Sequence, residues 1–295
     1  MTDDPFEMTG PRRDRWDRPL LIPRDGGERR AFTRMSTLAG FVTDDFGLSI
    51  WNRRLLAIGL SHREDLCAMV AALPALNDAQ CDKSSLTKQQ KQQDADTKAK
   101  LDDYIEQALE AAGRNYKANH GTAVHGFIES GSAEAAPERM RDDVESCFAA
   151  FAEHGIEVLA TEQFVANDEL CAAGSFDYLL RHPRYGIIPG DCKTGQVDGK
   201  GIQFAVQLAG YVGGEVYDWE TDQRSPLESL VGGEQVNRDI GLLVHVPLGG
   251  GRTHLYPVNL KLGLFAAQWA AGVRDLRSRK DYVGPELVVA EEAVA

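Results

Sequence analysis

Two aspartates and a lysine in the second half of the chain have the types and spacing of a phosphodiester-cleaving site. Asp177 ends the segment GSFD, and fourteen residues later the segment DCK places Asp191 and Lys193 two positions apart. Side chains two apart in a strand point to the same face, so the three groups can converge. Carboxylates suit Mg2+ or Mn2+, and a neighbouring lysine can orient or deprotonate water and neutralise a phosphorane-like transition state. A DxK pair on its own is more typical of a surface salt bridge.

Two helical pairs supply the context for this motif. His125 and Glu129 are four residues apart and therefore share a helical face, and a neutral imidazole adds a metal ligand to the two acids. Gln207 and Tyr211 repeat this spacing and offer an amide and a phenol toward a DNA phosphate or base. Each pair alone is typical of an ordinary helix. Their joint presence, in this order, is the informative feature.

The hydropathy pattern predicts the elements that must position these residues. Apolar residues at helical spacing indicate helices, and strict alternation of apolar and polar residues indicates strands. Glycine or proline marks the ends of these elements. The expected elements are helices over 36–73, 85–113, 122–131 and 137–154, strands over 158–164, 171–180 and 186–194, a helix over 201–219, strands over 240–246 and 252–260, and a helix over 261–279. Three consecutive strands predict a meander, and the last two predict a strand pair around a glycine turn.

Five short motifs together resemble a known family. They are GTAVHGFIE (121–129), TEQF (161–164), GSFD (174–177), DCKTG (191–195) and QLAGY (207–211). The series is similar to the RecB-type branch of the PD-(D/E)XK nuclease superfamily, and most of all to bacteriophage RecB-like exonucleases and the related CRISPR-associated exonuclease. The resemblance covers about residues 120–260, with weaker similarity over 36–51.

The resemblance implies roles for individual residues. It implies divalent-metal binding by His125, Asp177, Asp191 and the carbonyl of Cys192. It implies that Lys193 positions the attacking water, and that Gln207 and Tyr211 hold DNA near the scissile phosphate. Glu129 and Glu162 match motif positions with less direct roles. They would either contact the metal ligands or themselves act as a second metal ligand.

The chain also departs from the pattern of these relatives. The CRISPR-associated enzymes hold an iron-sulfur cluster with one upstream cysteine and three near the C-terminus, whereas this chain has no cysteine after Cys192. We therefore expect no cluster of that type, and we interpret Cys67 and Cys81 as buried or incidental thiols. Pro189 and Gly190 precede Asp191 and predict a bulge or a weakened strand. No P-loop motif is present, so the chain has no helicase motor of its own.

The charge distribution bears on DNA binding. The net charge is -13, and residues 101–250 carry 10 basic against 25 acidic side chains. Such acidity is usual for a solvated surface, but it also suits a cation site. Residues 1–30 carry seven arginines and seven acids, which fits either a solvated tail or a phosphate-contacting arm. Phosphate contacts are expected from basic residues of the flanks, namely Arg34, Arg53, Arg54, Arg63, Arg114 and Lys117.

Length and composition exclude several classes. The chain has 295 residues with 43% hydrophobic and 26% charged side chains, which predicts a folded protein. Its apolar stretches are far shorter than the roughly 20 residues that span a bilayer, and the N-terminal residues do not resemble a secretory signal. Five scattered cysteines without a CxxC pair favour free thiols. We expect a cytoplasmic protein in a bacterial host cell.

The resemblance implies an α/β (α+β) fold. Its core would be a restriction-endonuclease-like αβββαβ unit with a mixed sheet flanked by helices. An N-terminal helical lobe would form one wall of a DNA cleft. The expected division is a flexible arm over 1–30, the lobe over 31–118, the nuclease core over 119–280 and a tail over 281–295.

The expected function is a Mg2+- or Mn2+-dependent DNA exonuclease with little sequence specificity. It would act on ends or single strands in phage recombination or DNA processing. A structure-specific or nicking endonuclease would use the same residues, and a non-catalytic DNA-binding or assembly module is the alternative of another class. Partners beside DNA would be a recombinase, a helicase or a single-strand-binding protein, and a homo-oligomer is compatible with the sequence.

Overall fold

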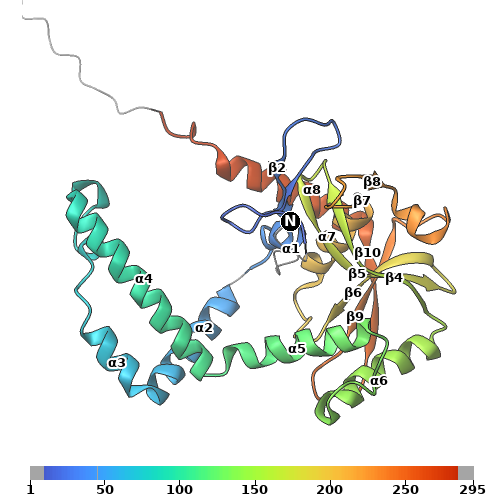
Figure 1. Ribbon diagram of the computed structural model, residues 1–295, viewed down its shortest axis with the longest axis horizontal. Helices are drawn as coiled ribbons and strands as arrows, with labels where there is room; N and C mark the ends of the chain where they lie inside the picture. The colour runs from blue at the N-terminus through green and yellow to red at the C-terminus, as the bar shows by residue number, and fades with distance from the viewer. Residues whose placement is uncertain (1–9, 45, 285–295) are drawn as a thin grey trace, which may run out of the picture.

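The computed structural model describes residues 10–44 and 46–284, in which helices surround one large sheet (Figure 1). The helices are α1 (Met35–Gly40), α2 (Phe46–His62), α3 (Glu64–Ala71), α4 (Lys88–Ala111), α5 (Arg114–Glu129), α6 (Glu138–Glu153), α7 (Gly201–Val212) and α8 (Leu260–Ser278). The strands are β1 (Leu20–Leu21), β2 (Arg30–Ala31), β3 (Thr33–Arg34), β4 (Glu157–Asn167), β5 (Ala172–His182), β6 (Gly186–Lys193), β7 (Glu215–Tyr217), β8 (Arg224–Ser225), β9 (Ile240–His245) and β10 (His254–Asn259). The expected mixed α/β architecture is confirmed.

The central sheet has the strand order β10-β9-β6-β5-β4-β7-β8, and β3 adds to it beside β5. Strands β4, β5 and β6 are antiparallel neighbours, which confirms the predicted meander. Strand β9 returns parallel to β6, and β10 pairs antiparallel with β9 across the glycine-containing turn. The sheet is therefore mixed, and β6 lies near its middle with a meander strand on one side and a parallel strand on the other.

Helices cover both faces of the sheet. On one face α1, α7 and α8 pack in a core that includes Leu208 and Ala267, both fully buried. On the other face α5 and α6 pack through residues such as Val144. The adjacent residues Ile187 and Ile188 of β6 point into these two cores in turn, as the period of a strand requires. Each such buried aliphatic side chain contributes roughly 1.5–3 kcal/mol.

Helix α5 begins earlier than predicted. The sequence indicated an N-cap at Thr122, but the helix starts at Arg114 and its N-cap is Gly113 with φ 79°. This left-handed conformation suits glycine, and it lets the chain end α4 and begin α5 almost at once. The hydroxyl of Thr122 instead donates to the carbonyl of Ala118 at 3.0 Å, within the helix.

Helix α7 ends earlier than predicted. The expected helix over 201–219 stops at Val212, and residues 215–217 form strand β7 beside β4. A side chain at Gly214 would lie 2.5 Å from Cγ1 of Val165, so only glycine allows the chain to pass β4 so closely. The glycine pair at 213–214 is therefore the point at which the helix gives way to a strand.

The proline and glycine before Asp191 do not interrupt β6. Pro189 pairs with Leu179 and Gly190 with Tyr178 in an unbroken antiparallel register. A Cβ atom at Gly190 would approach Cδ1 of Leu180 to 2.8 Å, so the glycine allows a close contact between the strands. The predicted bulge or weakening at this position is wrong.

The segment before α1 is more ordered than the predicted arm. Strands β1 and β2 form a small antiparallel pair, and Leu21 is fully buried against the sheet. Helix α1 packs on α7 through the buried Met35 and thus belongs with the core instead of the lobe. Residues 1–9 of the predicted arm and residues 285–295 of the predicted tail lie outside the described part.

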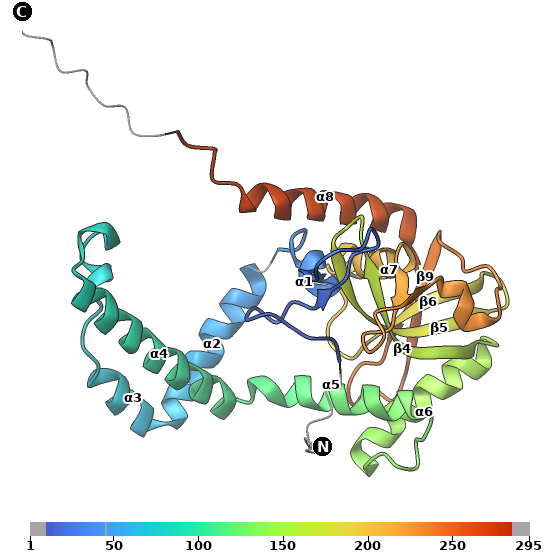
Figure 2. The same ribbon diagram turned by 45° about the horizontal axis from the view of Figure 1, so that its top comes forward.

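Helices α2, α3 and α4 form an arm that extends from the side of the core (Figures 1 and 2). Helices α2 and α4 pack closely, because a side chain at Gly59 would collide with the main chain of Ala108. The long exposed helix predicted after residue 84 begins at Lys88, where Thr87 and Gln90 form a capping box. Short 3-10 turns at residues 77–79 and 83–85 occupy the region of the predicted loop.

Candidate active site

The two predicted aspartates lie where strands β5 and β6 separate. The register of these strands pairs Tyr178 with Gly190, so continued pairing would bring Asp177 opposite Asp191. At this point a carboxylate oxygen of Asp177 accepts a hydrogen bond from the main-chain N–H of Cys192 at 2.6 Å. Beyond it β6 remains paired only with β9, through Asp191 and Leu243. Both acids therefore occupy the same end of the separating strands.

Helix α5 brings the predicted histidine to this point. Nε2 of His125 lies 3.0 Å from Oδ2 of Asp177, and Nδ1 faces a carboxylate oxygen of Glu129. The spacing of four residues places both side chains toward the sheet, as predicted. The buried neighbours Val124 and Ile128 hold this face of the helix in the core. The imidazole is thereby fixed between two carboxylates.

Glu162 joins the side chains of His125, Glu129, Asp177, Asp191 and Lys193 through an unusual backbone conformation. We call these six side chains the cluster. Its φ is 50°, whereas most non-glycine residues avoid positive φ because of steric strain. The register pairs Thr161 with Tyr178 and Gln163 with Phe176, which places Glu162 opposite Asp177. Ligand atoms of His125, Glu162 and Asp177 all lie within 4.8 Å of one another. These three residues form a possible metal-holding set, so Glu162 lies closer to the centre than the sequence indicated.

The electrostatics of the cluster follow from burial and from its many carboxylates. Burial raises the pKa of Glu162 to about 7, assisted by a hydrogen bond with Glu129 and by the charge of Asp177. Burial also disfavours ionisation of Asp177, but the hydrogen bond from His125 and the charge of Lys193 outweigh it and lower the pKa. Burial likewise opposes protonation of His125, yet its hydrogen bond to Asp177 and the surrounding carboxylates raise its pKa.

Asp191 and Lys193 form an ion pair inside the protein. The side chains project to the same face of β6, as predicted, and Nζ of Lys193 lies 2.5 Å from Oδ2 of Asp191. The exposed fraction of Asp191 is 0%, so the alternative of a surface salt bridge is wrong. Neither carboxylate oxygen has a partner with hydrogen-bond geometry among the described residues. A buried carboxylate without such partners is costly unless a cation or water completes its shell.

This donor set fits a divalent cation. The cluster offers an imidazole and several carboxylates at one point, which is the ligand chemistry of Mg2+ or Mn2+. Oδ1 of Asp191, which is buried and has no hydrogen-bond partner among the described residues, supplies the observation that supports this fit. His125, Glu162 and Asp177 would hold the ion, with Asp191 beside Asp177. The main-chain N–H of Cys192 supports Asp177. Metal ligation by the carbonyl of Cys192 stays a prediction.

Metal binding to this cluster is expected to depend on pH. Because the pKa of Glu162 is raised to about 7, its carboxyl group is protonated below that pH and must lose a proton to bind a cation. We therefore expect Mn2+ affinity to rise by about tenfold or more per pH unit between pH 6 and 7, and to go on rising above pH 7 until His125, whose pKa is also raised, has lost its proton. Calorimetric titration in buffers of different ionisation enthalpy would measure the proton release. Glu162→Gln should reduce that release, and a wild-type affinity independent of pH would contradict the prediction.

Close contact between α5 and the end of β6 holds the cluster together. A Cβ atom at Gly121 would lie only 2.2 Å from Oγ1 of Thr194, the residue directly after Lys193 in the DCKTG motif. Glycine at 121 thus lets the helix that carries His125 approach the strand that carries Lys193. A larger residue would push the two elements apart.

This contact gives a second prediction. Gly121→Val should reduce cleavage about 100-fold by displacing His125, and Gly121→Ala should reduce it less. Thr194→Ala should partly rescue Gly121→Ala, because it removes the colliding oxygen. Gly126→Ala is the matched control, since no neighbour lies within 4 Å of its Cβ position. Equal activity of Gly121→Val and Gly126→Ala would contradict a positioning role for this contact.

Gln207 and Tyr211 face a cavity beside the cluster. Nε2 of Gln207 donates to the hydroxyl of Tyr211 at 3.2 Å, as the predicted spacing allows. Both side chains are buried, and both line a cavity of about 320 Å³, which we call the end cavity. Arg13, Arg34, Ser36, Ser175 and Trp219 are also part of its lining. The cavity thus combines guanidinium groups, hydroxyls and an aromatic ring.

A second space adjoins the cluster. A cavity of about 270 Å³ is lined by His125, Lys193 and the Gly121 turn of α5. It shares Thr194 and Gly195 with a larger cavity of about 530 Å³ that reaches His245. Together these cavities form a groove that leads from Lys193 toward β9. The cluster therefore adjoins both the end cavity and this groove.

Of the arginines predicted to contact DNA, Arg34 lines the end cavity, whereas the others lie away from the cluster. Arg53 and Arg54 are exposed on α2, in the arm away from the sheet (Figure 2). Nε and Nη2 of Arg63 donate hydrogen bonds to the two carboxylate oxygens of Asp65, at 2.8 and 2.6 Å. Arg114 contacts Glu106 at the start of α5, about 16 Å along the helix from His125. The side chain of Lys117 lies outside the described part.

Sequence reasoning missed several residues around the site. Arg13 and Trp219 lie far from the motifs in the sequence and reach the end cavity only through the fold. An arginine-rich N-terminus was the only signal for Arg13. Cys67 and Cys81, expected as buried or incidental thiols, are exposed, whereas Cys147 and Cys192 are buried in the core.

Comparison with protein-family models and with curated proteins found no match to this chain. Within the described residues, every helix is too short or too polar to cross a membrane. The geometry of the cluster therefore carries the functional argument.

Proposed function

We propose that this chain is a divalent-metal-dependent deoxyribonuclease that hydrolyses DNA from an end. The observation that carries the proposal is Asp191, a wholly buried carboxylate that pairs with Lys193 through Oδ2 and whose Oδ1 has no hydrogen-bond partner among the described residues. A buried ion pair adds little net stability, and a buried carboxylate with a perturbed pKa beside other titratable groups is a candidate functional residue. The neighbouring group of His125, Glu162 and Asp177 supports the same proposal.

The residues divide the chemistry of phosphodiester hydrolysis among them. A divalent cation held by His125, Glu162 and Asp177 would supply charge stabilisation and an acidified water. Lys193 donates hydrogen bonds beside Asp191 and orients the attacking water toward the phosphorus. Gln207 and Tyr211 hold the strand from the side of the end cavity. This division matches the roles that the resemblance to RecB-like nucleases implies.

The end cavity favours an exonuclease over the alternatives. Its volume of about 320 Å³ lies at the lower end of the roughly 300–1,000 Å³ typical of small-molecule sites. A space of this volume suits about one nucleotide with its phosphate. Arg13 and Arg34 supply charges for that phosphate. An endonuclease would use the same cluster, and a binding module would have no use for the buried Asp191.

The test is digestion of end-labelled linear DNA, single- and double-stranded, beside closed circular DNA. Reactions contain Mg2+, Mn2+ or EDTA, with Asp177→Asn as the inactive control. We expect metal-dependent loss of linear DNA and an intact circle. Nicking of the circle would establish the endonuclease instead. No cleavage of any substrate, with DNA still bound, would establish the binding module.

A further inference from the structure

The N-terminal loop, residues 10–19, lines the end cavity on the side away from the catalytic cluster. Gly10, Pro11, Arg13 and Pro19 contribute to its lining, whereas Ser175, two residues before Asp177 in β5, contributes from the side of the cluster. Most of this loop is exposed, but Pro11 and Pro19 are buried. A strand that reaches the cavity past the cluster therefore meets this loop next.

The loop is held in a defined shape by its own contacts. Arg13 and Pro19 form a β-bridge across it, and the carboxylate of Asp14 accepts hydrogen bonds from the main-chain N–H and the guanidinium of Arg18. Arg34, which lines the cavity, contacts Asp17 of the loop at 2.5 Å. The loop is thus a closed turn and not an extended tail.

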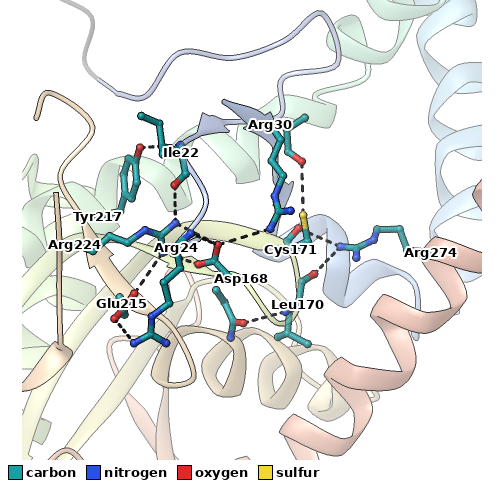
Figure 3. A network of polar contacts seen from close by, with 12 residues as sticks. Ile22, Arg24, Arg30, Asp168, Leu170, Cys171, Glu215, Tyr217, Arg224 and Arg274 are labelled. Carbon is teal, nitrogen blue, oxygen red and sulfur yellow. Dashed lines mark hydrogen bonds and ion pairs between the residues drawn. The ribbon is translucent and has the colours of Figure 1, made fainter. Parts of the chain in front are cut away.

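A network of ion pairs anchors the chain immediately after the loop (Figure 3). Asp168, in the connection between β4 and β5, accepts a hydrogen bond from the main-chain N–H of Arg24 at 2.9 Å and one from Arg224 at 2.6 Å. The same Arg224 donates to the carbonyl of Ile22 at 2.9 Å. Glu215 contacts the guanidinium of Arg24 at 2.9 Å. These partly buried contacts tie the β1–β2 hairpin to the sheet.

The loop continues this anchored structure without a break. The N–H of Leu20 donates to the carbonyl of Arg12 at 2.8 Å, and the N–H of Phe32 donates to the carbonyl of Pro19 at 2.8 Å. Phe32 and Leu21 are themselves fully buried. The base of the loop is therefore attached to a rigid part of the fold, and a DNA strand would have to break these contacts to pass.

We infer that residues 10–19 form an end stop that limits the DNA strand beyond the scissile phosphate to about one nucleotide. This inference rests on the proposed nuclease function and explains its restriction to ends. A strand enters along the groove beside Lys193, passes the cluster and ends against the loop. Internal or circular strands are excluded because they cannot end there. The expected products are mononucleotides or very short fragments.

Two truncations test the end stop. Removal of residues 1–19 deletes the loop and its hydrogen bonds to Leu20 and Phe32 but ends before the buried Leu21, so the pairing of β1 with β2 and the contacts of Asp168 are left in place. Removal of residues 1–9 is the matched control, because it leaves the loop in place. Each protein is given linear and circular single-stranded DNA of the same sequence with Mn2+, and product lengths are measured on gels.

For the protein lacking residues 1–19, we expect the cleavage rate of circular DNA relative to that of linear DNA to rise about tenfold or more. Its products should also be longer. The truncation of residues 1–9 should behave as wild type. Asp168→Asn leaves every lining residue in place but weakens the anchor, and it should raise the same ratio by a smaller factor. The Asp168→Asn variant also tests the end stop if the protein lacking residues 1–19 does not fold.

The inference is overturned if the protein lacking residues 1–19 still cuts linear DNA to short products and leaves the circle intact. Where that protein does not fold, the same result for Asp168→Asn overturns it. That result would leave the proposed nuclease function standing. Failure of the wild type to cut linear DNA would instead overturn the proposed function, and the end stop with it.

Discussion

Asp191→Asn is expected to abolish DNA cleavage and, in the same molecule, to make the metal-free protein more stable. The carboxylate is wholly buried, and its oxygens lack hydrogen-bond geometry with any described residue. Burial raises the pKa of Asp191 to about 6, against the partly compensating charge of Lys193. An ionised group in this position opposes folding when no cation is bound.

The sign and size of the effect follow from linkage. The folded-state pKa is raised from 3.8 to about 6, so the protonated acid favours folding at low pH and this contribution is lost as pH rises through 6. At pH 8 the ionised carboxylate costs about 3 kcal/mol, and at pH 5 roughly half of that. Asparagine removes the charge but leaves Lys193 less compensated. We expect a rise in Tm of roughly 2–6 °C at pH 8 and a smaller rise at pH 5.

The measurement is thermal unfolding in EDTA at both pH values, followed by cleavage of linear DNA with Mn2+. Asp143→Asn is the matched control, because Asp143 is equally buried but its oxygens accept hydrogen bonds from Gly249 and Gly251 at 2.7 and 3.0 Å. That variant should lower Tm, since it loses charge-assisted bonds. The cleavage rate of Asp191→Asn should fall about 10³-fold or more.

Opposite results would separate the two parts of the prediction. A Tm of Asp191→Asn below that of wild type at pH 8 would mean that Asp191 is structural, like Asp143. Cleavage near the wild-type rate would remove Asp191 from the catalytic cluster. A stability gain together with lost cleavage is the signature of a charge retained for chemistry at the expense of folding.

Much of the cluster was predictable because local periodicity controls it. The spacing of His125 and Glu129 on a helix, and of Asp191 and Lys193 on a strand, determines which face each pair shares. The meander of β4, β5 and β6 followed from alternation and from turn residues. These features depend on residues near one another in the sequence.

The rest depends on tertiary contacts that no local pattern contains. The positive φ of Glu162 arises within a strand that otherwise alternates normally, so nothing in TEQF signals its turn toward the cluster. Gly113 could be seen as a helix end but not as the start of the next helix. Arg13 lines the end cavity because the N-terminal loop packs beside α1, which no spacing in the motifs determines.

Lys193→Ala is expected to cause a loss of cleavage as large as that of Asp191→Asn, but without loss of metal binding. Burial lowers the pKa of Lys193, yet the charges of Asp191 and Asp177 more than offset this and raise it. The side chain is therefore an ammonium group near neutral pH. It can donate hydrogen bonds and neutralise charge, but it cannot accept a proton from water. This favours orientation of the attacking water over general-base catalysis as its role.

The size of the loss follows from that role. Removal of a preorganised donor at the point where charge develops slows such reactions by up to about 10³-fold. Single-turnover cleavage of linear DNA measures the rate, and calorimetric titration with Mn2+ measures metal binding. We expect the Mn2+ affinity of Lys193→Ala to equal or exceed that of wild type, because a cationic neighbour of the metal ligands is removed. DNA affinity in EDTA should change little.

Lys200→Ala is the matched control for the loss of one positive charge near the site. Lys200 is exposed at the N-cap of α7, seven residues after Lys193. If general positive charge were the requirement, both variants would lose cleavage to a similar and modest extent, and added salt would reduce the difference from wild type. If Lys193 acts on the reacting atoms, only its removal abolishes cleavage at every salt concentration. A rate for Lys193→Ala within tenfold of wild type would exclude the lysine from the reaction, and with it the assigned function of the DCK motif.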